Sequence, residues 1–286
     1  MDQSRLSLMT FPMDIDLFKK TMSIRDVLEL AQRAGIPNVD VMNVREGQIP
    51  QYLEAMKETG VRVYTYITQI SFLGSEKRRN KAIRTSLETA KLLDAKYLMI
   101  VPYGFPDWYR ARKIGREAVK QHMIDGFRKA VEMGQLFGIR VCFETTPHDA
   151  SCLSGTQDCL DVLNAVDGLE FVFDTANMLP HGDDPLEAYE ALKGRISHVH
   201  LKDVVLEQKP KVFKHSEHTP DGKLMRCVIW GEGIIPVREI CGRMMADGYT
   251  GQFAIEYVHP EGKYDLEGNI PQVNKFLEKV HCWIRC

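Results

Sequence analysis

The sequence predicts a single α/β domain over residues 1–286, a (β/α)8 TIM barrel with a parallel eight-stranded core. Short apolar, β-branched runs alternate with longer segments of helical period, at the spacing of roughly 25–40 residues that a strand–helix unit requires. The apolar runs show little strict alternation, which is typical of parallel strands covered by helices. No linker, low-complexity segment or charge block divides the chain.

Eight runs have the composition of strands. They are Leu6–Thr10, Asn38–Met42, Arg62–Thr68, Tyr97–Pro102, Arg140–Thr145, Glu170–Thr175, Ser197–Lys202 and Gln252–Tyr257. Helical segments lie between them, including Ile24–Ala34, Glu76–Leu93, Gly115–Phe137, Thr156–Val166, Pro185–Leu192 and Pro236–Asp247, and Ile270–Trp283 is expected as a closing helix. A glycine ends several of these helices, where a left-handed stop is easiest.

The first strand decides between a barrel and a doubly wound sheet. A doubly wound sheet usually has a glycine-rich loop after this strand, whereas here the strand runs into Thr10-Phe-Pro-Met13. A barrel instead brings the carboxyl ends of all its strands to one central point, where barrel active sites lie. We therefore expect functional side chains at those ends.

Composition narrows the function classes. The net charge of -2 gives no electrostatic reason to expect nucleic-acid binding. The chain has no apolar run of the length that a membrane span needs, and its N-terminus lacks the apolar stretch of a signal peptide. The seven cysteines are an odd number without metal-finger spacing. These features favour a reduced, cytoplasmic protein.

Four metal-seeking side chains follow four consecutive apolar runs. The runs are Val-Cys-Phe-Glu144, Phe-Val-Phe-Asp174, His198-Val-His200 and Phe-Ala-Ile-Glu256. Adjacent strands lie about 4.8 Å apart, so inward-facing residues from these strand ends can meet around one ion. Carboxylate oxygens with one imidazole suit one divalent cation. We expect Mn²⁺, with Mg²⁺, Zn²⁺, Co²⁺ or Fe²⁺ as alternatives.

Each of these residues has a plainer interpretation when taken alone. A single Asp or Glu at a strand end is commonly a helix N-cap or an ion-pair partner. Their shared placement, rather than any one residue, favours a metal site. His198 lies two residues before His200, on the same strand face but one layer deeper, and is expected to be a hydrogen-bonded interior residue.

These motifs resemble the xylose isomerase-like TIM-barrel superfamily, most specifically between residues 139 and 260. The segments that carry the resemblance are Phe143-Glu144, Asp174-Thr-Ala-Asn177, His198-Val-His200-Leu-Lys202-Asp203, Trp230-Gly-Glu-Gly233 and Gly248-Tyr-Thr-Gly-Gln-Phe-Ala-Ile-Glu256. The superfamily includes sugar isomerases and epimerases, inositol-pathway isomerases and dehydratases, and nucleases of the endonuclease IV type. The resemblance implies one divalent ion held by Glu144, Asp174, His200 and Glu256, with Glu144 and Glu256 also forming the catalytic acid/base pair.

The nuclease branch of the superfamily fits this chain poorly. Its three metals require further His and Glu ligands from the first four strands. Here those strands end in Thr10-Phe11, Met42-Asn43, Thr68-Gln69 and Pro102-Tyr103. The resemblance therefore implies a small-molecule substrate and no nucleic-acid partner.

Three functions remain open. The first is a metal-dependent isomerase or epimerase of a keto sugar, a sugar phosphate or an inositol ketone, acting by proton removal next to a metal-bound carbonyl. The second is a lyase or dehydratase, because the same enolate can eliminate a neighbouring oxygen substituent. The third is a non-catalytic scaffold, which would have no need for four metal ligands. A homo-oligomer is possible, but no interface can be recognised.

Substrate contacts are expected from five further residues. Asn177 occupies a position similar to that of a substrate-binding histidine in sugar epimerases, and His148 follows Glu144 in a loop. Lys202 binds a substrate oxygen or forms an ion pair with Asp203 or Asp174. The others are Trp108, as an apolar wall or a surface packing residue, and Arg226, as a site for an anionic group. Trp108 and Arg226 belong to basic segments, Gly104–Lys113 and Val205–Ile229, that we interpret as loops, the second as a possible lid.

Overall fold

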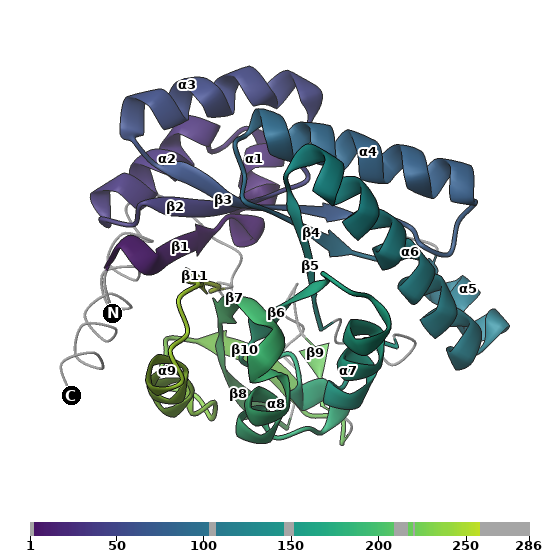
Figure 1. Ribbon diagram of the computed structural model, residues 1–286. Helices are drawn as coiled ribbons and strands as arrows, with labels where there is room; N and C mark the ends of the chain where they lie inside the picture. The colour runs from purple at the N-terminus through teal and green to yellow at the C-terminus, as the bar shows by residue number, and fades with distance from the viewer. Residues whose placement is uncertain (1–2, 103–106, 146–151, 209–216, 220, 258–286) are drawn as a thin grey trace.

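A computed structural model describes residues 3–102, 107–145, 152–208, 217–219 and 221–257 of the chain (Figure 1). Eight parallel strands close a barrel in the order β1-β11-β7-β6-β5-β4-β3-β2, which confirms the expected (β/α)8 fold. The barrel strands are β1 Leu6–Met9, β2 Asn38–Met42, β3 Arg62–Gln69, β4 Tyr97–Val101, β5 Arg140–Glu144, β6 Glu170–Asp174, β7 Ile196–Leu201 and β11 Gln252–Ile255.

Helices surround the strands, with α2, α3 and α4 above the barrel in Figure 1 and α7, α8 and α9 below it. The helices are α1 Asp14–Lys19, α2 Ile24–Arg33, α3 Ile49–Thr59, α4 Glu76–Leu92, α5 Asp107–Ile114, α6 Arg116–Phe137, α7 Thr156–Ala165, α8 Pro185–Leu192 and α9 Val237–Ala246. In the described part of the chain, none of them is long and apolar enough to cross a membrane. The expected helix Ile270–Trp283 lies outside the described residues.

Local sequence explains where helices begin and end. Ser23 starts α2 with a capping box, in which its hydroxyl accepts a hydrogen bond from the backbone N–H of Asp26. Asp184 caps α8 by accepting from the backbone N–H groups of Leu186 and Glu187. At the end of α6, Gly138 adopts the left-handed conformation with φ 70°. These signals fix the turns that return the chain to the barrel.

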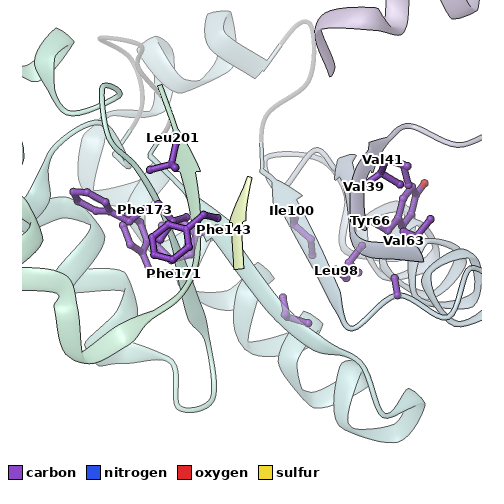
Figure 2. Close-up of a cluster of buried hydrophobic side chains, with 14 of the residues drawn as sticks. Val39, Val41, Val63, Tyr66, Leu98, Ile100, Phe143, Phe171, Phe173 and Leu201 are labelled. Atoms are coloured by element: carbon purple, nitrogen blue, oxygen red, sulfur yellow. The ribbon is translucent and has the colours of Figure 1, made fainter. Parts of the chain in front are cut away.

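The strands divide their side chains between two environments. Outward residues such as Phe143, Phe171 and Phe173 are buried against the helices, and Figure 2 shows them with Leu201 in this layer. The ring centroids of Phe143 and Phe171 are 5.3 Å apart in an edge-to-face arrangement. Inward residues form a smaller cluster inside the barrel, made of Met9, Ile67, Tyr97, Met99, Cys142 and Val172. The main apolar core is therefore the layer between strands and helices.

Both segments interpreted as loops contain regular structure in their described parts, so the interpretation was wrong for those parts. After β7, a three-stranded antiparallel sheet in the order β8-β10-β9 is formed by Asp203–Glu207, Leu224–Val228 and Glu217–His218. Apolar residues from Val204 to Leu206 pair with β10, where Val205 lies opposite Arg226. Most of Gly104–Lys113 belongs to α5, whose acidic first turn and basic last turn suit the helix dipole.

Candidate metal centre

The four residues of the expected metal site come together at the carboxyl end of the barrel. Glu144 is the last residue of β5, Asp174 is the last of β6, His200 lies near the end of β7 and Glu256 follows β11 directly. His200 pairs in register with Asp174 on one side and with Ala254 on the other. Each residue offers one potential ligand atom, and these atoms all lie within 4.8 Å of one another.

His200 is the centre of this group. Its Nδ1 lies 2.9 Å from Oε2 of Glu144 and 3.4 Å from Oε2 of Glu256. Asp174 is oriented by the chain that follows it, because its Oδ1 accepts hydrogen bonds from the backbone N–H groups of Ala176 and Asn177. The carboxylate of Asp174 therefore caps the turn after β6 with one oxygen and turns the other into the site.

Lys202 supplies a buried positive charge to the same group. Its Nζ lies 2.7 Å from Oε1 of Glu256 and 3.0 Å from Oδ2 of Asp174. It also donates a hydrogen bond to Oδ1 of Asn177 at 3.1 Å. The ion pair with Asp174, which was the alternative to a substrate contact of Lys202, is present. The contact with Glu256 was not anticipated, because it depends on how β7 and β11 are aligned.

Burial and neighbouring charges shift the pKa values of three residues at this site, Asp174, His200 and Glu256. Burial, reinforced by Glu256 and Glu144 and opposed by Lys202, raises the pKa of Asp174 to about 7. Burial would lower the pKa of His200, but Glu144 and Glu256 outweigh it and raise that pKa well above its ordinary value. Burial also opposes ionisation of Glu256, yet Lys202 and His200 hold its pKa below the usual range.

The donor set fits a divalent cation. When Asp174 and His200 lose their protons, three carboxylates face the single positive charge of Lys202, which leaves an excess of negative charge in a buried place. Buried Oε2 of Glu256 has no hydrogen-bond partner among the described residues, although buried polar atoms are normally paired. Carboxylate oxygens and an imidazole nitrogen are ligands of Mn²⁺, Zn²⁺ and related ions. An ion at this point would use the unpaired oxygen and offset the excess charge.

Asp203 organises the chain beside the site, a role that the sequence analysis did not assign. Its two carboxylate oxygens accept hydrogen bonds from the backbone N–H groups of Val204, Gly231, Gly233 and Ile235. A Cβ at Gly233 would lie 2.1 Å from Oδ1 of Asp203, so the turn requires glycine there. Trp230 donates from its indole N–H to the carbonyl oxygen of Leu201. The Trp230–Gly233 motif thus closes tightly on the end of β7.

The other residues expected to contact substrate lie in different parts of the molecule, and only some of them are near the metal group. Asn177 is buried beside the group and bonded to Lys202. Arg226 lies in β10, where its Nε is 2.6 Å from Oε1 of Glu207, so it is partly engaged within the small sheet. His148 and the side chain of Trp108 lie outside the part of the chain that the structure describes.

Two buried residues lie beneath the metal group. As expected, His198 is a hydrogen-bonded interior residue, and its partner is Asp40 on β2, with Nε2 2.6 Å from Oδ2. Asp40 was not predicted as a site residue from the sequence, where it lies within the apolar run Val39-Asp40-Val41. A charged residue in the middle of a buried strand is the signal that could have found it.

A hollow of about 500 Å³ lies at the opposite end of the barrel. It is lined by residues at or near the amino ends of the strands, including Tyr97, Arg140, Glu170 and Ser197. Barrel active sites are built at the carboxyl ends of the strands, and the buried carboxylate–imidazole group is there. We therefore place the candidate site at the carboxylate–imidazole group and not at this hollow.

Comparison with known proteins identifies the family of this chain. Residues 26–280 match the family model described as xylose isomerase-like TIM barrel. The chain belongs to this family. An inosose dehydratase of Lacticaseibacillus casei is 26% identical over 171 residues, which is 59% of this chain and 49% of that protein. The chain therefore spans about half the length of this curated relative.

Solved structures share the fold of this xylose isomerase-like protein at low sequence identity. The IolI protein, whose crystal structure has a bound zinc atom, superposes with a TM-score of 0.74 at 18% identity, over 96% of this chain and 97% of IolI. A probable 3-DHS dehydratase, AsbF from Bacillus anthracis, gives a TM-score of 0.73 at 14% identity, over 97% and 98% of the two chains. These likenesses support the barrel architecture.

Proposed function

We propose that this protein is a metal-dependent lyase that removes water from a polyhydroxylated ketone, an inositol ketone or a keto sugar. The observation that carries this proposal is the buried group of Glu144, Asp174, His200 and Glu256 at the carboxyl end of the barrel. Those four residues would hold one divalent ion. We propose Mn²⁺ as that ion, with Zn²⁺, Mg²⁺, Co²⁺ or Fe²⁺ as alternatives to be compared directly.

Proton removal is assigned to the two glutamates. When bound, the ion would act as a Lewis acid that makes hydrogens next to a ketone more acidic. Glu144 and Glu256 both approach Nδ1 of His200, at 2.9 and 3.4 Å, so a substrate bound at this group would lie beside two carboxylates. The side chain of Glu144 is 15% exposed and that of Glu256 is 6% exposed. One carboxylate takes the proton, a contribution of about 10²–10⁴-fold to the rate.

Elimination also needs an acid, and Lys202 is suited to that role. Its ammonium lies within the group, 2.7 Å from Glu256. The base takes the proton from the carbon next to the carbonyl, and the electron pair of that C–H bond becomes a C=C bond. The bond from the neighbouring carbon to its hydroxyl oxygen breaks, and that oxygen takes a proton from Lys202 and leaves as water. The names of the inosose dehydratase relatives support this outcome.

An isomerase or epimerase is the second candidate, and the pairing of two carboxylates favours it. In that reaction, the second glutamate enters the reaction protonated and gives its proton to the neighbouring carbon or to the opposite face. No carbon–oxygen bond breaks, and Lys202 would only hold a substrate oxygen. The two candidates share the first step and differ in the fate of the electron pair.

Proton NMR in D₂O tests the shared step and separates the outcomes. The metal-loaded protein is incubated with an inosose and with a panel of keto sugars. We expect deuterium at a carbon next to the carbonyl together with a dehydrated product. An isomeric product without dehydration would select the second candidate. No exchange and no product with any member of the panel would contradict the proposal.

A further inference from the structure

Asp40 occupies the barrel interior beneath the candidate metal centre. It projects from β2 and is fully buried, and its Oδ2 lies 2.6 Å from Nε2 of His198 on β7. Two strands, β1 and β11, separate β2 from β7 in the barrel, so this contact crosses the interior. Ser7 on β1 donates a hydrogen bond to the other oxygen, Oδ1, at 2.9 Å. Asp40 is therefore fixed from two strands.

The imidazole of His200 lies between Asp40 and the metal group. Its Nδ1 points to Glu144 and Glu256, whereas its Nε2 lies 3.8 Å from Oδ2 of Asp40. This buried Nε2 makes no hydrogen bond to any described residue. When Nδ1 gives its lone pair to an ion, the ring proton must lie on Nε2. The carboxylate of Asp40 is placed to receive that proton in a hydrogen bond after a small movement.

We propose that Asp40 is a positioning residue for the metal centre, acting through His200. Its carboxylate favours the ring tautomer that leaves Nδ1 free for the ion, and it fixes the orientation of the ring. Ser7 and His198 hold the carboxylate in place. Metal-binding histidines commonly make such a bond through their second nitrogen, and loss of the partner weakens metal binding about 10–100-fold. This inference rests on the proposed metal site.

A second ion between Asp40, His198 and His200 is the alternative, because these residues also offer atoms within 4.8 Å of one another. The distance of 2.6 Å between Asp40 and His198 argues against it. Two ligands of one ion, each about 2.0–2.2 Å from the metal, lie farther apart than this in tetrahedral or octahedral geometry. A direct hydrogen bond explains the contact without an ion.

Co²⁺ binding to the whole protein tests the inference. The affinity of the Asp40→Asn variant is measured by competition with a chelator, and the visible absorption of bound Co²⁺ reports the ligand geometry. We expect affinity to fall 10–100-fold and the absorption bands to shift. Asp158→Asn is the matched control, because Asp158 is a buried carboxylate on α7 that pairs with Arg116. Its Co²⁺ affinity and spectrum should match those of the unmodified protein.

The outcomes separate this inference from the proposed function. If the unmodified protein binds no Co²⁺, both fail. If it binds one ion and Asp40→Asn binds Co²⁺ with unchanged affinity and spectrum, only the positioning role fails. Two ions in the unmodified protein and one in the variant would overturn the inference in favour of a second metal site. If Asp40→Asn does not fold, Ser7→Ala decides: several-fold weaker binding supports the inference, and unchanged binding overturns it.

Discussion

Neighbouring residues on the same strands have opposite roles in this protein. Phe143 and Phe173 face the helices, where they pack in the main apolar core, whereas Glu144 and Asp174, the next residues along the chain, belong to the candidate metal group. Because successive side chains of a strand point to opposite faces, one short run supplies a residue of the apolar core and a residue of the candidate metal group. Packing that maintains the fold and groups that carry chemistry are thus separated by a single residue.

The two faces also differ in what burial does to them. Burial of an aromatic side chain outside the barrel stabilises the fold by removing apolar surface from water. Burial of Asp174 inside the barrel opposes its ionisation and raises its pKa to about 7. Substitutions on the outer face should therefore change stability, and substitutions on the inner face should change metal binding and turnover.

Replacing Glu256 by Gln should abolish most turnover while the barrel remains folded. The amide can neither act as a base nor provide an anionic ligand, and we expect a loss of about 10³-fold or more in kcat. Steady-state kinetics with the metal-loaded protein measures it. Glu170→Gln is the matched control, because Glu170 begins β6 at the opposite end of the barrel. A near-normal rate for Glu256→Gln would contradict the role of this residue as a base and metal ligand.

Replacing Phe173 by Ala should destabilise the protein by about 3–5 kcal/mol, because it leaves a cavity in a fully buried layer. Denaturant unfolding of the metal-free protein measures the change in free energy. Metal affinity of the protein that remains folded should stay within a few-fold of normal. Loss of metal binding without loss of stability would show that the outer face also controls the site.

Metal affinity should rise with pH between about 5 and 8. The raised pKa values of Asp174 and His200 mean that both groups hold protons that an ion must displace. Below pH 7, affinity should fall about tenfold per pH unit for each proton released. Chelator competition across this range measures it, and an affinity independent of pH would contradict the assigned ligands.

Stability of the metal-free protein should change with pH in the opposite direction. The pKa of Asp174 is higher in the folded protein than its ordinary value of 3.8, so the folded state binds this proton more tightly than the unfolded state does. The stability that this tighter proton binding contributes to the folded state is therefore lost as pH rises from about 4 to 7. Denaturant unfolding of Asp174→Asn beside the unmodified protein isolates this contribution, since the variant should lack it.

The smallest effect is expected at Arg226. Replacing it by Gln should raise KM several-fold for an anionic substrate and leave a neutral one unaffected, because its positive charge is lost. Glu207→Gln is the matched control, since it breaks the same ion pair but keeps the arginine. Equal effects of the two variants would mean that the pair only maintains the small sheet.

Sequence periodicity was sufficient to predict the barrel strands. It also predicted that four side chains would lie close together, because parallel strands place their carboxyl ends at one edge; these are Glu144, Asp174, His200 and Glu256. It was insufficient for contacts that depend on the barrel's closure. Asp40 meets His198 only because β1 and β11 close the ring between their strands. The strands β8 and β10 were missed because their pairing spans a long, charged segment that resembles a loop.

Anomalous diffraction from crystals grown with Mn²⁺ shows whether the four residues of the candidate metal group bind one ion. We expect one anomalous peak per chain, bounded by Glu144, Asp174, His200 and Glu256, with Nδ1 of His200 as the imidazole ligand. That peak should be lost in crystals of Glu256→Gln grown under the same conditions. A peak elsewhere in the barrel, or no peak with Mn²⁺ or with Zn²⁺ in its place, would contradict the account.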